Sequence, residues 1–269
     1  MGMRELVMTS SVTGGALLLF VGLQWLASLR LGDVSIVDRF WGMGFLLAAI
    51  VAMLLNHQDS SRAMLLAAMV ALWAARLSLY ITWRNWGAGE DYRYQAMRRR
   101  LGPRFKWSSL LIVFVLQGAL TWIISAPLQI VMARDGSPLG WLDVAGLCLW
   151  LIGFAFETVG DWQMARFKSD PRNAGRALDR GLWRYTRHPN YFGDALVWWG
   201  HFIVALSTPG AVYTVISPII MTYLLLRVSG VTLLESHLHK TKDGYEAYVK
   251  STNAFIPWFP RRGVGMSAK

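Results

Sequence analysis

The sequence predicts an all-α fold, an integral membrane bundle of about seven spanning helices, on three observations. Apolar residues make up 54% of the 269, and only 16% of the residues are charged. The apolar residues gather in stretches that approach the roughly 20 residues a spanning helix needs. Lys and Arg concentrate in alternate connecting segments, as they do in membrane proteins.

The first apolar stretch follows a weakly charged start without a small-residue cleavage site, so we expect a retained helix and not a signal peptide. The second and sixth stretches are short and need tilt or polar neighbours to match the bilayer. The predicted spanning helices cover 11–29, 41–56, 63–83, 108–132, 139–160, 191–207 and 211–234.

The basic residues predict the topology. With the N-terminus outside, the segments expected in the cytoplasm are 30–40, 84–106, 161–188 and 235–269, and these hold 22 of the 27 Lys and Arg residues. The net charge of +11 is then a topology signal, and no nucleic-acid partner is expected. Residues 1–269 contain no repeat or linker, so we expect a single membrane domain with a cytoplasmic or interfacial tail at 235–269.

Neither a disulfide nor a metal site is predicted. Cys148 is the single cysteine and lies in an apolar run. His237 and His239 are two residues apart and lack the further ligands that a zinc site needs.

A dense polar cluster stands where the sixth helix begins. Pro189 suits the first turn of a helix, because that turn needs no hydrogen bond from it. The unpaired N–H groups of the turn and its positive dipole end favour an anion, and Arg187, His188 and Asn190 add donors there. A phosphate or a carboxylate would fit, although a basic flank before a membrane helix is also ordinary topology.

Ionisable residues inside the apolar stretches are costly, about 2.5–3.5 kcal/mol each, and need partners or water. Arg76 lies one turn before Tyr80, and Glu157 one turn before Asp161, so each pair shares a helix face. Buried structural pairs would explain them as well as a polar active site. After Asp161 the fifth helix is expected to continue as far as Lys168 into an arginine-rich segment able to bind phosphate oxygens.

The run from Gly181 to Asp194, followed by Trp198-Trp199-Gly200, resembles the C-terminal domain of the steroid 5-alpha-reductase superfamily, in particular its bacterial branch of uncharacterised membrane proteins. The segments 38–42, 76–80 and 89–94 are similar to its N-terminal half. The resemblance implies an enzyme of the bacterial inner membrane that takes NADPH from the cytoplasmic side. Such an enzyme transfers hydride to a conjugated double bond of a lipid-like substrate.

The resemblance also implies a cofactor site. Arg187, His188 and Tyr191 belong to its signature, Arg76 and Tyr80 lie near the site, and Arg166 is added on position and charge alone. The predicted cofactor-binding residues are Arg76, Asp161, Arg166, Lys168, Arg176, Arg187, His188, Asn190, Tyr191, Asp194 and His237.

The chain departs from the steroid reductases on the substrate side. Their Gln-Glu pair on the second helix and Tyr on the third have no match here, and Trp73 stands where that Tyr is expected. The steroid substrate and the proton donor therefore stay open. The candidates for catalytic residues are Asp38, Tyr80, Tyr92 and Tyr94.

Two other classes compete with a reductase. Isoprenylcysteine carboxyl methyltransferases share an Arg-His-Pro-x-Tyr signature, and S-adenosylmethionine would then replace NADPH, with Glu235, Gly244, Tyr245 and Tyr248 as its acidic and tyrosine elements. A lipid-binding scaffold without catalysis is the third class. Asn190, the Trp198-Trp199 pair and the N-terminal match favour the reductase. The expected partners are membrane lipids and a lipid-like small molecule, and the sequence carries no signal of oligomeric state.

Overall fold

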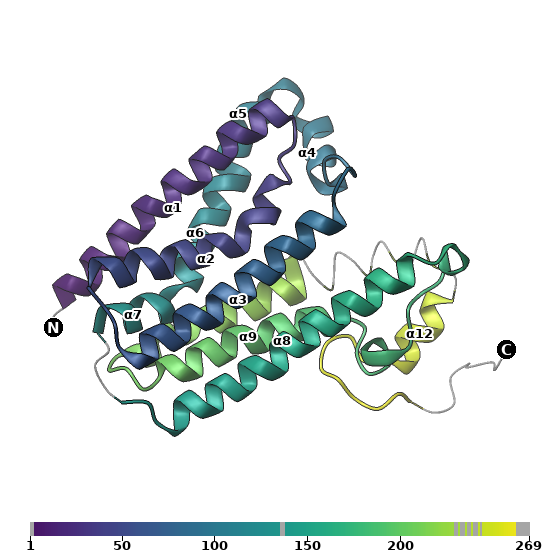
Figure 1. Ribbon diagram of the computed structural model, residues 1–269. Helices are drawn as coiled ribbons and strands as arrows, with labels where there is room; N and C mark the ends of the chain where they lie inside the picture. The colour runs from purple at the N-terminus through teal and green to yellow at the C-terminus, as the bar shows by residue number, and fades with distance from the viewer. Residues whose placement is uncertain are drawn as a thin grey trace. The chain divides into compact units, whose positions relative to one another are not determined.

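The computed structural model describes residues 3–134, 138–228, 231, 235, 238, 242 and 244–261, and every regular element in these ranges is helical (Figure 1). The all-α prediction is confirmed. Contacts divide the chain into two compact units. Unit 1 comprises residues 1–144 and 201–217, and unit 2 comprises residues 145–200 and 218–269.

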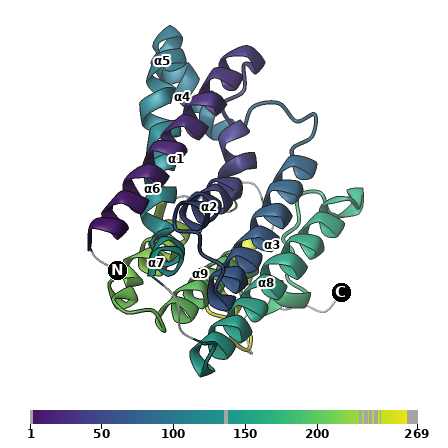
Figure 2. The ribbon, with the colours of Figure 1, turned by 60° about the vertical axis from the view of Figure 1, so that its left-hand side comes forward.

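Three long helices begin unit 1: α1 (Met3–Leu31), α2 (Ile36–Leu55) and α3 (Ser61–Arg84). Helix α2 contacts both α1 and α3, an arrangement visible in Figures 1 and 2. Gly42 lets α2 approach α3 closely, since a Cβ at this position would lie 3.1 Å from the Cα of Ala74. Small residues at such crossings let backbones pack in a bilayer, where apolar burial alone does not drive association.

The rest of unit 1 is a broken helical run. Asp91 caps α4 (Tyr92–Leu101), and Gly102 then bends the chain with a positive φ of 57°. A 3₁₀ turn, η1 (Gly102–Arg104), leads into α5 (Phe105–Ser109), the π-helical η2 (Leu110–Val115) and α6 (Leu116–Ile124). The stretch expected as one helix at 108–132 is interrupted at Ser125, and α7 (Ala126–Arg134) begins anew, because Pro127 has no N–H to continue the ladder.

Unit 2 holds most of α8 (Trp141–Lys168), α9 (Pro189–Ala205) and α10 (Ile216–Tyr223). Helix α8 runs on to Lys168, and α9 begins at Pro189, both as expected. Two 3₁₀ turns, η3 (Pro171–Asn173) and η4 (Gly181–Arg184), lie between α8 and α9. The π-helical η6 (Leu224–Val228) follows α10, a short α12 (Tyr245–Ser251) comes near the end, and η5 (Ala211–Val215) belongs to unit 1.

Six helical stretches of the described chain are long and apolar enough to cross a membrane, which identifies an integral membrane protein. They are Arg4–Leu31, Ile36–Leu55, Ser61–Arg84, Tyr92–Ile124, Trp141–Lys168 and Ala211–Val228. The remaining predicted span, 191–207, forms as α9, whose 17 residues fall short of the roughly 20 needed.

Candidate functional site

In unit 1, polar side chains converge on Asp38 in the first turn of α2. The Tyr94 hydroxyl donates to Asp38 Oδ1 at 2.8 Å, and Arg93 Nη2 donates to Asp38 Oδ2 at 2.7 Å. Arg93 also donates from Nε to Asp91 Oδ1 at 2.9 Å. We call these four residues the Asp38 network.

The N-terminus of α4 builds this network. Asp91 is the N-cap, and its carboxylate accepts the backbone N–H of Arg93 at 2.9 Å. The cap fixes the first turn of α4, so Arg93 and Tyr94 both reach Asp38. Partial burial raises the pKa of Asp91, but the hydrogen bonds and charge of Arg93 outweigh it and leave that pKa below its ordinary value.

Two further carboxylates fasten the connecting segments around the Asp38 network. Glu90 accepts two hydrogen bonds from Arg98, at 2.9 and 2.7 Å, and one from the Val34 N–H at 2.9 Å. Asp33 pairs with Arg39 at 2.8 Å. The Val34–Glu90 hydrogen bond therefore joins the segments 32–35 and 89–91, and it is charge-assisted, which makes it one of the stronger kind.

The other catalytic candidates of unit 1 lie on α3 and at the start of α4. The Tyr80 ring is covered by two guanidinium groups, with Arg76 at 5.5 Å and Arg84 at 5.6 Å from its centroid. Tyr92 is 52% exposed. The structure thus joins Asp38 and Tyr94 in one network, whereas Tyr80 stacks with cations of its own helix.

In unit 2, α8 and α9 pack against each other along a row of glycines. A Cβ on Gly193 would lie 2.5 Å from the carbonyl oxygen of Gly153, and one on Gly200 would lie 2.8 Å from that of Gly146. Two helical turns after Gly153, a Cβ on Gly160 would lie 3.2 Å from Cγ of Pro189. The five glycines, here called the glycine seam, let the two backbones lie closer together than larger residues would allow.

The glycine seam places Asn190 against Asp161. Asn190 Nδ2 donates to Asp161 Oδ1 at 3.1 Å, while Asn190 Oδ1 accepts the Tyr191 N–H at 3.1 Å. Asp161 is 6% exposed. Trp183 completes this end of α8 by donating from Nε1 to the carbonyl oxygen of Gly160 at 3.1 Å.

Arg187 and His188 share Glu235. Arg187 reaches Glu235 Oε1 with Nε at 2.8 Å and with Nη2 at 2.7 Å, and His188 Nε2 lies 3.2 Å from the same oxygen. The His188 ring stacks on Tyr191, with centroids 5.4 Å apart and planes 2° from parallel. Within the described residues, His188 Nδ1 is buried without a hydrogen-bond partner.

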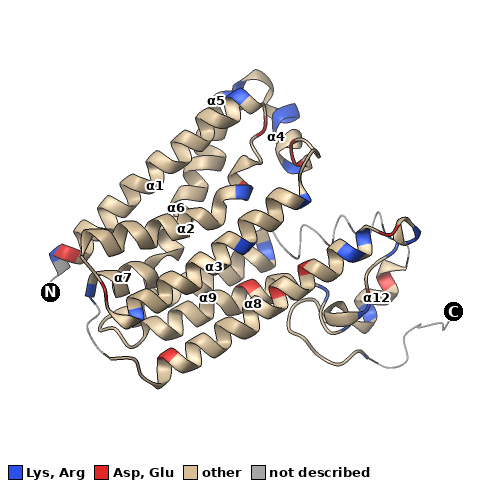
Figure 3. Ribbon diagram, in the orientation of Figure 1, with Lys and Arg blue, Asp and Glu red and all other residues tan. Residues whose placement is uncertain are grey.

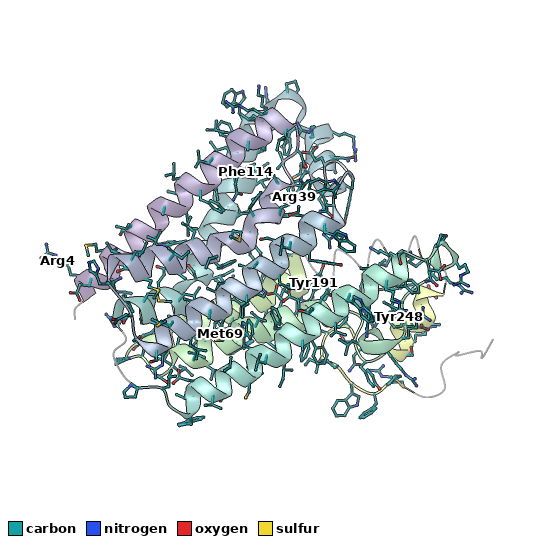
Figure 4. All side chains as sticks on the ribbon, viewed as in Figure 1. Arg4, Arg39, Met69, Phe114, Tyr191 and Tyr248 are labelled. Atoms are coloured by element: carbon teal, nitrogen blue, oxygen red, sulfur yellow. The ribbon has the colours of Figure 1, made fainter. Side chains whose placement is uncertain are left out.

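Hydrogen bonds join the C-terminal segment to the loop before α9; Figure 4 labels Tyr248 of this segment. Arg187 Nη1 donates to the carbonyl oxygens of Val249 and Thr252, and the Tyr248 hydroxyl of α12 donates to that of Trp183. Further hydrogen bonds tie Thr186 to residues 254–255 and Tyr185 to residue 258. Arg187 therefore directs each of its three side-chain nitrogens to a group within the chain.

Glu235 is charged in this setting. Partial burial raises its pKa, but hydrogen bonds from His188 and Arg187 and the charge of Arg187 outweigh burial and leave the pKa below its ordinary value. Burial, followed by the charge of Glu235, raises the pKa of Tyr245 to about 12. Burial likewise raises the pKa of Tyr248, so both phenols stay protonated at neutral pH.

The remaining predicted cofactor residues lie at the end of α8 and beyond it. Arg166 stacks over the Trp162 ring at 5.5 Å and is exposed, as are Lys168 and Arg176. Asp194 is 8% exposed in the second turn of α9. His237 lies outside the described residues.

Neither the glycine seam nor the pairing of Arg187 with Glu235 was predicted from the sequence. The seam has a readable signal, since Gly146, Gly153 and Gly160 recur every seven residues, as do Gly193 and Gly200. A seven-residue interval keeps small residues on one helix face. The Arg187–Glu235 pair joins residues 48 apart and leaves no such signal.

The family described as "Protein of unknown function (DUF1295)" matches residues 24–252. An uncharacterized protein of Schizosaccharomyces pombe is 29% identical over 226 residues, which cover 72% of this chain and 64% of that protein. No solved structure matches.

Two relatives carry names that state an activity. The 3-oxo-5-alpha-steroid 4-dehydrogenase 1 of Rattus norvegicus is 27% identical over 116 residues, covering 43% of this chain and 41% of that protein. The steroid 5-alpha-reductase DET2 of Arabidopsis thaliana is 31% identical over 78 residues, covering 29% of each. The chain therefore spans less than two thirds of each relative's length. The resemblance to the bacterial branch of the superfamily and the relation to the isoprenylcysteine carboxyl methyltransferases remain predictions.

Proposed function

Since this chain belongs to the DUF1295 family and is similar to two steroid-transforming oxidoreductases, we propose that it is a membrane-embedded reductase that uses NADPH to reduce a conjugated double bond in a lipid-like substrate. The observation that carries the proposal is the similarity to the rat and Arabidopsis proteins. Fold likeness alone would not fix a function, so the polar groups of each unit have to suit the chemistry.

The polar groups of unit 2 suit a phosphorylated dinucleotide. Arg166, Lys168 and Arg176 offer exposed cations at the end of α8 and in the loop after it, where they can pair with phosphates. His188 Nδ1 is buried and lacks a hydrogen-bond partner in the described chain, so it can serve a polar group of a ligand. NADPH would supply the hydride.

Other residues of unit 2 hold these groups in place. The Asn190–Asp161 hydrogen bond fixes the first turn of α9, whose positive dipole end favours an anion. Arg187 and Glu235 fasten the preceding loop and set the His188 ring through its Nε2. Such support keeps a binding site preorganised, which reduces the entropy lost on binding.

The Asp38 network of unit 1 holds groups that suit the proton transfer of a reduction. Reduction adds hydride to the β-carbon of an enone and a proton to its α-carbon, so the carbon–carbon double bond becomes single and NADPH becomes NADP⁺. The Tyr94 hydroxyl, which is hydrogen-bonded to Asp38 at 2.8 Å, is the candidate donor of that proton, and the tyrosinate left behind takes a replacement proton from water. Arg93, which also contacts Asp38, stabilises the negative charge that this exchange leaves.

The first test is thermal stabilisation of the full chain in detergent by NADPH, NADH and S-adenosylmethionine. A ligand that binds only the folded state at a hundred times its Kd stabilises it by about 2.7 kcal/mol. We expect a shift with NADPH that Arg176→Gln removes. Arg172→Gln is the matched control, because Arg172 is exposed in the same loop and pairs with Asp170. A shift with S-adenosylmethionine alone would refute the reductase and favour a methyltransferase.

A further inference from the structure

A second basic feature lies in unit 1, apart from the Asp38 network. Residues 92–106 contain six Lys and Arg and no Asp or Glu. Arg93 and Arg98 pair with carboxylates, as described above. The other four basic residues are exposed, and no ion pair is recorded for them within the described chain; they are Arg99, Arg100, Arg104 and Lys106, here called the basic collar.

The basic collar lies at the boundary of a membrane span. The apolar part of the span Tyr92–Ile124 follows directly after Lys106. Trp107 is 65% exposed, its ring lies 5.6 Å from that of Trp25, and Trp25 Nε1 donates to the Lys106 carbonyl oxygen at 3.1 Å. Exposed tryptophans mark the level of lipid headgroups, so the collar faces that level. Figure 3 shows Lys and Arg gathered around α4 and α5.

A cavity of about 210 Å³ opens beside the collar, between the end of α1 and α5. It is smaller than the roughly 300–1,000 Å³ of sites that enclose a whole ligand, which suits part of a headgroup. Arg98 is neutralised by Glu90 and stacks on Phe105 at 5.0 Å, so the uncompensated charge at the cavity is that of Lys106. Its lining combines hydroxyl, apolar and basic groups, among them Ser28, Leu29, Val34, Arg98, Phe105 and Lys106.

We infer that unit 1 binds an anionic phospholipid at this place. The phosphate pairs with Lys106 and the neighbouring arginines of the collar, and the glycerol end of the headgroup occupies the cavity. A lipid is favoured over a soluble anion because the tryptophans place the collar at headgroup depth. A collar that only sets topology would attract no particular lipid.

The test measures thermal midpoints of the detergent-purified full chain with short-chain phosphatidylglycerol, short-chain phosphatidylcholine or inorganic phosphate. Of the three compounds, only phosphatidylglycerol should raise the thermal midpoint, and added salt should reduce that increase. Equal stabilisation by inorganic phosphate would show that the site binds a free anion and would refute the lipid proposal. No difference between the two lipids would overturn the proposal.

Variants locate the site. Arg104→Gln/Lys106→Gln should weaken the apparent affinity for phosphatidylglycerol by about fivefold for each charge removed. Lys106→Arg should retain binding. Arg4→Gln is the control, since Arg4 is exposed at the opposite end of α1 in the same unit. If the double variant folds and binds phosphatidylglycerol like the unaltered protein, the collar is not the site. If it fails to fold, native mass spectrometry of the unaltered protein must show phosphatidylglycerol retained over phosphatidylcholine, or the proposal fails.

Discussion

Asn190 donates a hydrogen bond to Asp161 across 3.1 Å, which joins the first turn of α9 to the part of α8 that leaves the apolar stretch. The two residues are 29 positions apart and meet because glycines let their helices touch. Asp161 is buried, so the amide donates to a carboxylate that is costly to remove from water.

Asn190→Ala should remove NADPH binding and destabilise the protein by about 1–3 kcal/mol, because the buried Asp161 carboxylate loses this hydrogen bond. Asn190→Asp should destabilise the protein more than Asn190→Ala, since two carboxylates would then face each other. Thermal unfolding with and without NADPH measures both effects. Unchanged NADPH stabilisation in Asn190→Ala would exclude Asn190 from the cofactor site.

Gly193→Ala should destabilise the protein by about 1–3 kcal/mol, since the added methyl group would lie 2.5 Å from the Gly153 carbonyl oxygen. Gly15→Ala is the matched control in α1, where a Cβ has no neighbour within 4 Å. That change should be neutral or stabilising, because alanine favours helix. Equal thermal midpoints for the two variants would refute tight packing at the glycine seam.

Glu235 should make stability depend on pH. Its folded pKa lies below its unfolded value, so its contribution is present above the ordinary value of 4.5 and is lost as pH falls through the folded pKa. Glu235→Gln should therefore lose about 1.5–3 kcal/mol near neutral pH and progressively less below pH 4.5. Unfolding of both proteins followed by tryptophan fluorescence across this range checks the sign. A difference that grows towards acid would contradict it.

Tyr94→Phe should lower kcat for enone reduction by about 10²–10⁴-fold while NADPH stabilisation persists, because it removes only the proton donor. Tyr213→Phe is the control, with Tyr213 83% exposed. Loss of NADPH absorbance in detergent, with a panel of conjugated ketones, gives the rate. Should Tyr92→Phe alone abolish the rate, Tyr92 would be the donor instead.

The basic loops predict that the C-terminus lies in the cytoplasm. A green fluorescent protein fused there should fluoresce, and an alkaline phosphatase fused there should be inactive, since each needs its own compartment to fold. The reverse pattern would invert the predicted topology. The same fusions after residue 58 should report the outside.

The sequence by itself determined that the chain is helical and membrane-embedded, because length, apolar composition and charge distribution are local properties. It also located the C-terminal end of α8 at Lys168, before a polar loop, and the beginning of α9 at Pro189, which favours the first turn of a helix. Helix α7 shows the limit of such patterns, since an apolar run does not reveal that Pro127 starts a new helix.

Only the tertiary structure decided which polar residues meet. The sequence did not show which residues contact Asp38. In the structure Asp91 caps α4, and Arg93 and Tyr94 in the first turn of that helix both donate to Asp38. The sequence did not reveal that Arg187 contacts Glu235 and backbone carbonyls near the C-terminus. Pairings between residues tens of positions apart depend on how helices pack, and a single sequence carries no periodic signal of that packing.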